Sequence, residues 1–238
     1  MPNSTYNNLV EEITVSDDKA HSAYITYLYN RLAEEVLRAE GSALLHFDDR
    51  AALHIKLNKD SARVQSALQR EIAEVLGVGY KNKYLEERLA VSLSKRERKL
   101  LRAALIAADC EGDAAYIRRK ITSSSEYAID GIYNFRLGRL REKWDKIIGY
   151  VPAGFSSVDL TRFCEFLVGE SRNKIYLRDN VVFGENFAPL RRSRLTGEED
   201  IETEILLSDA GFVYCLGDVT DELSDFLQKY YAERAIFS

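Results

Sequence analysis

Residues 130–137 read Asp-Gly-Ile-Tyr-Asn-Phe-Arg-Leu, and the interpretation of this stretch decides how the fold is understood. A glycine inside a helix costs about 1 kcal/mol relative to alanine, so Gly131 in a helical pattern indicates close packing. Asp130 and Asn134 are four residues apart and share one helix face. We interpret the stretch as a helix crossing at which a carboxylate–guanidinium pair fixes the register. The alternative is a groove for a ligand or partner. The motif consists of Asp130, Gly131, Asn134, Phe135, Arg136 and Leu137.

The surrounding residues, 81–150, predict a central helical zone that contains no strand. One of its helices opens with Ser94-Lys95-Arg96-Glu97, a capping box in which serine and glutamate satisfy free amides at the helix start. The Gly-Tyr-Val-Pro-Ala-Gly stretch at 149–154 marks the clearest boundary in the chain. The helices are expected over residues 83–91, 94–109, 113–122 and 125–148.

A smaller mixed zone precedes the helical zone, over residues 1–80. Apolar spacing and β-branched runs predict strands at 9–15, 43–47 and 53–57, the last two as a hairpin. Helices are expected over 18–40 and 61–76. We expect Gly41 to end the first through a left-handed backbone, and Gly77 and Gly79 to close the second.

A second mixed zone follows, over residues 151–238. It predicts helices over 157–168, 198–208 and 218–232, and strands at 174–177, 181–184, 212–216 and 235–237. The fold class is therefore helix-rich α+β: a central helical bundle flanked by two small mixed α/β zones with short, partly antiparallel sheets. The zones 1–80, 81–150 and 151–238 form either three units or one continuous domain.

Composition excludes several classes of protein. The 238 residues carry a net charge of −5 with 46% hydrophobic residues, too many for a disordered chain. The three cysteines form no paired framework, which fits a reducing compartment. No apolar run approaches the ~20 residues of a membrane span, and no signal peptide is recognisable. We expect a cytoplasmic protein without a membrane span.

Residues with catalytic chemistry are scarce. His46 and His54 lie on the predicted hairpin without further ligands at a metal spacing, and no nucleophile motif is present. The glycines at 77–81 lack the final Gly-Lys-Ser/Thr of a phosphate loop. We predict no catalytic, cofactor-binding or metal residue and no cofactor, which favours a protein that is not an enzyme. An enzyme with a site assembled from scattered residues is the remaining alternative.

Charge is distributed unevenly. Residues 80–150 hold sixteen Lys or Arg and ten Asp or Glu, a net charge of +6, so the remainder carries −11. Clustered cations on one face are what phosphate binding requires. The alternative is a solvated helix surface, or a dock for the acidic zones, and we favour it over nucleic-acid binding. The candidate nucleic-acid contacts are Lys95, Arg96, Arg98, Lys99, Arg118, Arg119 and Lys120.

The run Asp130-Gly131-x-x-x-Phe135-Arg136-Leu137 resembles the Asp-Gly-Phe-x-x-Phe-Arg-Leu signature of the YtxC-like proteins, a family associated with sporulation in endospore-forming bacteria. Ile132 stands where the signature has an aromatic residue. The resemblance implies a sporulation-associated protein that acts through contacts with a partner protein, and it brings no binding or catalytic residue with it.

Overall fold

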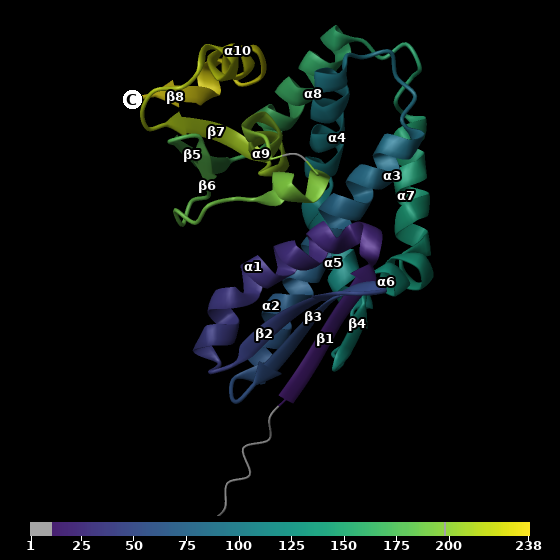
Figure 1. Ribbon diagram of the computed structural model, residues 1–238. Helices are drawn as coiled ribbons and strands as arrows, with labels where there is room; N and C mark the ends of the chain where they lie inside the picture. Colours follow the sequence, from purple (N-terminus) through teal and green to yellow (C-terminus); the bar gives the residue numbers. More distant parts are fainter. Residues whose placement is uncertain (1–10, 198) are drawn as a thin grey trace, which may run out of the picture. The chain divides into compact units, whose positions relative to one another are not determined.

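The computed structural model describes residues 11–197 and 199–238 (Figure 1). Helices hold 58% of the chain and strands 19%, and the strands form two small mixed sheets. The helix-rich α+β class predicted from the sequence is therefore confirmed.

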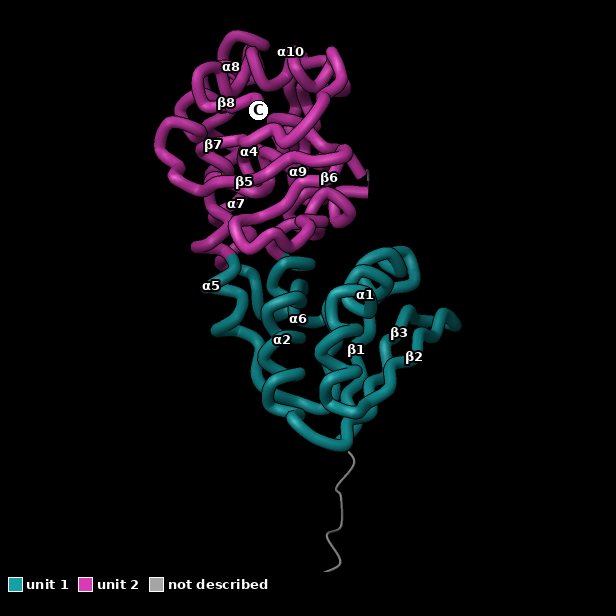
Figure 2. The backbone as a smooth tube through the Cα atoms, turned by 90° about the vertical axis from the view of Figure 1, so that its left-hand side faces the viewer, with its two compact units in different colours: residues 1–76, 114–138 teal, residues 77–113, 139–238 magenta. Residues whose placement is uncertain are grey.

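The chain groups into two compact units (Figure 2). Unit 1 contains residues 1–76 and 114–138, and unit 2 contains residues 77–113 and 139–238. This division differs from the three consecutive zones expected from the sequence, because the central zone is shared between the units. Its residues 126–128 form a strand that completes the sheet of unit 1.

Unit 1 contains a sheet with the order β2-β3-β1-β4. β3 is antiparallel to β1 and β2, whereas β4 is parallel to β1. The predicted hairpin is thereby confirmed, and the prediction of a strand-free central zone is wrong. The strands are β1 (Glu11–Asp18), β2 (Ser42–Phe47), β3 (Arg50–Leu57) and β4 (Glu126–Ala128). Leu9 and Val10 of the first predicted strand lie outside the described residues.

Two helices form the second layer of unit 1. α1 (Ser22–Arg38) packs on β1, β2 and β3, and α2 (Ser61–Glu74) packs on α1. Alternate residues of β1 and β3 are buried, and the residues between them are exposed or half-buried. One face of the sheet is therefore covered and the other is open. The covered face carries Ile13, Val15, Leu53, Ile55 and Leu57.

Two glycine predictions in unit 1 are wrong in detail. The left-handed residue after α1 is Glu40, with φ 51°, and not Gly41. Gly41 is needed for a different reason: an added Cβ would lie 2.9 Å from Leu57 Cδ2 and closer still to the Lys56 carbonyl oxygen. Gly77 and Gly79 do not end the second helix. Residues 75–80 continue α2 as a π-helical turn that leads into α3 (Lys81–Arg88).

The long helix predicted over 125–148 is interrupted. The chain forms β4, then α6 (Ile129–Arg136), then α7 (Gly138–Gly149). Tyr127 and Ile129 are buried in unit 1, so tertiary packing outweighs the helical propensity of these residues. α6 contacts both β1 and β4.

Unit 2 has a second sheet with the order β6-β5-β7-β8. β7 is parallel to both β5 and β8, and β6 turns back antiparallel to β5. Asp179 and Asn180 connect β5 to β6 with φ of 50° and 60°, as a tight hairpin turn requires. The predicted hairpin and the predicted last strand are confirmed. The strands are β5 (Asn173–Arg178), β6 (Val181–Phe183), β7 (Ala210–Cys215) and β8 (Ala235–Phe237).

The helices of unit 2 pack around α4, which contacts α3, α8 and α9. The capping box predicted at Ser94 is present, with Glu97 bonded to the Ser94 amide. α8 also contacts β7 and α10. The remaining helices are α4 (Lys95–Ala107), α5 (Cys110–Lys120), which runs from unit 2 into unit 1, α8 (Ser157–Glu170), α9 (Ile201–Leu207) and α10 (Asp221–Tyr230).

Candidate functional site

The first charge of the 130–137 motif is held by β3. The Arg50 guanidinium donates from Nη2 to Asp130 Oδ1 over 2.6 Å and from Nη1 to Oδ2 over 3.1 Å. These bonds from Arg50 hold the pKa of the Asp130 carboxyl below its usual value. Asp130 lies in the first turn of α6, where a carboxylate also stabilises the helix dipole. The predicted carboxylate–guanidinium pair exists, with Arg50 rather than Arg136 as the cation.

The second charge of the motif is held by α5. Arg136 Nη1 donates to the Lys120 carbonyl oxygen over 3.1 Å and to Thr122 Oγ1 over 3.2 Å. The last carbonyls of a helix have no partner within the helix, so a guanidinium there satisfies them and opposes the negative end of the dipole. Both ends of α6 are thus tied to other elements of unit 1.

The glycine of the motif does not mark a close helix crossing. A Cβ added at Gly131 would meet only the Cβ of Ala128, at 3.4 Å, which is an ordinary contact distance. The motif instead packs through its apolar residues, Ile132 and Leu137, which are buried. The close packing expected at this glycine is absent from the described residues around it.

Phe135 is the exception among the apolar residues of the motif, because 88% of its surface is exposed. A phenylalanine left in water on a helix held at both ends resembles the aromatic anchors of protein interfaces. Asn134 and Arg136 beside it are also exposed.

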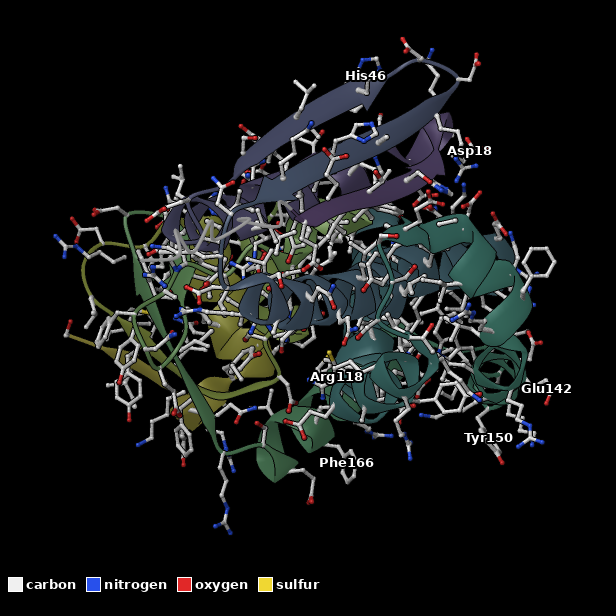
Figure 3. The ribbon with its side chains drawn as sticks, turned by 90° about the horizontal axis from the view of Figure 1, so that it is seen from below. Asp18, His46, Arg118, Glu142, Tyr150 and Phe166 are labelled. Atoms are coloured by element: carbon white, nitrogen blue, oxygen red, sulfur yellow. The ribbon has the colours of Figure 1, made fainter. Side chains whose placement is uncertain are left out.

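The bond from Arg136 to Lys120 brings one predicted cation cluster next to the motif. Arg118, Arg119 and Lys120 form the last turn of α5 and are all exposed. Lys120 lies over the ring of Tyr116, with its Nζ 5.5 Å from the centroid. Arg118 is labelled in Figure 3. We call Phe135, Arg136, Arg118, Arg119 and Lys120 together the Phe135 surface.

The second predicted cation cluster lies on α4 in unit 2, where acidic residues meet it. Arg96 Nε donates to Glu202 of α9 over 2.9 Å, and Lys99 Nζ lies 3.1 Å from an oxygen of Asp200, the cap of that helix. Lys95 and Arg98 are exposed on the same helix. Arg96 and Lys99 therefore bind acidic residues within unit 2. The two predicted clusters belong to different units.

A buried ionic cluster in unit 2 was not predicted from the sequence. Asp113 and Lys81 are both 0% exposed, and Lys81 Nζ donates to Asp113 Oδ2 over 2.8 Å. The Trp144 indole donates to the same oxygen over 2.9 Å, and Lys143 Nζ donates to Oδ1 over 2.9 Å. Lys143 also lies 3.1 Å from Asp109 Oδ1. The two carboxylates, four residues apart at the start of α5, were the only signal in the sequence.

The electrostatics of this cluster favour the charged forms. Burial would raise the pKa of Asp113, but the Lys81 charge and the hydrogen bonds from Lys81, Lys143 and Trp144 outweigh it and lower the pKa. Burial likewise opposes the charge on Lys143, and its bonds to Asp113 and Asp109 raise its pKa. The Asp113 carboxylate has both oxygens occupied by donors and no exposed surface, so its buried charge is compensated and has no access to a substrate.

The histidines and cysteines do not assemble a catalytic site in the described part of the chain. His54 Nδ1 lies 3.1 Å from Thr14 Oγ1. His46, labelled in Figure 3, lies on the open side of the unit 1 sheet, with its Nδ1 2.8 Å from Asp48. Within residues 11–197 and 199–238, no group of three or more ligand-type side chains could hold a metal ion. Burial raises the pKa of the Cys164 thiol to about 12, which leaves it unreactive.

No helix among the described residues is long and apolar enough to cross a membrane. In comparisons with protein families, with curated proteins and with solved structures, the chain matches none of them.

Proposed function

We propose that this chain is a binding protein without catalytic activity, and that the Phe135 surface anchors a partner protein. The observation that carries the proposal is the 88% exposure of Phe135 on a helix whose two charged residues are each bonded to other elements of unit 1. An aromatic side chain has only two rotatable bonds, so on a backbone held in this way it loses little conformational entropy when a pocket closes around it.

The surface also specifies the chemistry of the partner. Phe135 requires an apolar pocket, and the three cations at the end of α5 favour acidic residues at its rim. From the resemblance of residues 130–137, we propose that the partner is engaged in the cytoplasm during sporulation.

Single-stranded nucleic acid is the second candidate, since an aromatic ring beside exposed cations also fits a stacked base and its phosphates. Two observations weigh against it. Such proteins stack successive bases on several aromatic residues, whereas the second aromatic ring at this surface, that of the half-buried Tyr116, already lies under Lys120. The α4 cations that would extend a basic track include two that bind Asp200 and Glu202.

The test places a photoreactive phenylalanine analogue at position 135 in sporulating cells. The matched control carries the analogue at Phe166 of α8, which is 62% exposed and belongs to unit 2. The expected result is a discrete protein adduct from position 135 that is absent from position 166 and lost in the Arg118→Glu/Arg119→Glu background. Identical adducts from both positions would contradict the proposal, and adducts with nucleic acid would support the second candidate.

Phe135→Ala separates binding from folding. Because the side chain is almost wholly in water, the variant should keep the melting temperature of the parent chain while its capture of the cross-linked partner falls. Unchanged capture by this stable variant would refute the role of Phe135.

A further inference from the structure

The outer edge of the unit 1 sheet is unpaired along β2. β2 is the first strand in the order β2-β3-β1-β4, and its six residues pair only with β3. Among the described residues, no backbone hydrogen bond outside that ladder reaches residues 42–47. Every second residue of an edge strand turns its N–H and C=O groups away from the sheet, so β2 offers a row of free donors and acceptors.

Edge strands of monomeric proteins usually carry protection against pairing with another chain. The common devices are lysine or proline on the strand, a bulge, or very short length. β2 reads Ser-Ala-Leu-Leu-His-Phe, without Lys or Pro and with an unbroken register against β3, and it is longer than the other edge strands β4, β6 and β8. β2 therefore carries none of these features that protect the edge strands of monomeric proteins from pairing with another chain.

Two large apolar side chains of β2 are exposed where a neighbouring strand would cover them. Leu44 is 61% exposed and Phe47 is 43% exposed. They point to opposite faces of the sheet, because Leu44 pairs with His54 on the open face and Phe47 pairs with Ala51 on the covered face. A single added strand would contact both of them.

We propose that β2 pairs antiparallel with β2 of a second copy of this chain, which joins the two four-stranded sheets into one continuous sheet. Residues directly opposite in an antiparallel pair point to the same face. A two-fold axis at Leu45 satisfies this condition. It places Leu45 opposite Leu45 of the second copy and Ala43 opposite Phe47 on the covered face, with Leu44 opposite His46 on the open face.

Charge complementarity favours a second copy as the occupant. At the start of β2, Lys56 is already paired with Glu12 and Lys59 with Glu40. The other end of the strand runs into Asp48 and Asp49. With the axis at Leu45, Glu40 of one copy lies opposite Arg50 of the other, and the two-fold axis repeats this pair of unlike, partly exposed charges at both ends of the joined strands. A two-fold axis at Leu44 would instead place Glu40 opposite Asp48, two like charges.

Sedimentation velocity of the full chain over a range of concentrations tests the proposal. The expected result is a concentration-dependent shift from the 27.1 kDa monomer to a species of twice that mass. Leu44→Lys adds the edge protection that β2 lacks and should weaken the dimer by about tenfold or more in Kd. Phe166→Lys, an equally exposed apolar residue on α8, is the matched control and should leave the dimer unchanged.

A cysteine experiment tests the register. In a Cys110→Ser background, Leu45→Cys should form a disulfide between copies under mild oxidation, since the two residues face each other across the axis. Ala43→Cys should not, because its own counterpart lies four residues along the ladder. A chain that stays monomeric at every concentration and gives no Leu45→Cys cross-link, with the melting curve of the parent, overturns the proposal. A dimer that Phe166→Lys disrupts and Leu44→Lys leaves intact overturns it as well.

Discussion

Asp113 accepts hydrogen bonds from Lys81, Lys143 and Trp144 while it is completely buried. An ion pair in such a place is not a large net gain in stability, because both charges have left water. Removal of one partner is costly nonetheless, since the other charge stays buried without compensation.

We predict that Asp113→Ala lowers the free energy of unfolding by about 3–5 kcal/mol, because the Lys81 ammonium is left unpaired. Glu142→Gln on the exposed side of α7, labelled in Figure 3, should change it by less than about 0.5 kcal/mol. Denaturant titrations of both variants check the difference. Equal midpoints would show that Lys81 finds another partner.

The same carboxylate makes stability depend on pH. The pKa of Asp113 is lower in the folded chain than its ordinary value of 3.8, so the unfolded chain binds the proton more tightly. The stabilisation is therefore present above the unfolded pKa and is lost as pH falls through that range towards the folded pKa. Asp130, lowered by its bond to Arg50, contributes in the same direction.

We expect the free energy of unfolding to decrease steadily below about pH 4. Asp130→Asn removes the contribution of Asp130. The free energy of unfolding of this variant should therefore fall less steeply on acidification than that of the parent chain. Urea titrations at a series of pH values measure both slopes. A parent chain whose stability rises on acidification would contradict the predicted sign of the pH dependence.

At the scale of the helix and strand, two glycines separate what a sequence pattern predicts from what packing decides. Gly131 was expected to mark close packing and has ordinary space around it, whereas Gly41 was expected to supply a backbone angle and instead leaves room for the Lys56 carbonyl. Neither neighbour is visible from the local sequence, because both are set by tertiary contacts.

The two glycines give a paired prediction. Gly131→Ala should raise the free energy of unfolding by about 0.5–1 kcal/mol, because alanine restricts the unfolded chain and its methyl group fits. Gly41→Ala should lower it by about 1–3 kcal/mol, because the methyl group collides with backbone that cannot move freely. Thermal unfolding of both variants tests the pair. A destabilised Gly131→Ala would contradict the ordinary spacing at Gly131 and support the close helix crossing expected from the sequence.

Elements with strong local signals were predictable from the sequence. Both hairpins, the Ser94 capping box and the amphipathic helices α1 and α2 follow from spacing and turn residues. β4 was missed because its three residues carry a helical pattern and become a strand only by pairing with β1. The Asp113 cluster was missed for a similar reason: Lys81 and Lys143 reach it from distant parts of the chain.

At the scale of the whole molecule, the two compact units are not consecutive stretches of the sequence. Unit 1 is built from two separated segments, and the second contributes part of its core. The buried side chains of this second segment are Ile117, Ile121, Tyr127, Ile129, Ile132 and Leu137.

A fragment of residues 1–80, the first zone expected from the sequence, should therefore fail to fold cooperatively. It lacks β4, α6 and the Asp130 partner of Arg50, and it leaves one side of β1 unpaired. Proton–nitrogen NMR spectra of this fragment should show poor dispersion, whereas residues 1–238 should give dispersed peaks. A well-dispersed fragment spectrum would mean that the first segment alone holds a sufficient core.

The boundaries between the units fall inside helical segments, at 76/77 in the π-helical turn, at 113/114 in α5 and at 138/139 in α7. The chain crosses from one unit to the other at these three boundaries, so β1 belongs to unit 1 and β8 belongs to unit 2. A fluorophore near β1 and a second of another colour near β8 would thus follow the melting of the two units independently in one sample. Rigid helical joints would transmit the loss of one unit to the other, and the two dyes would then report one temperature.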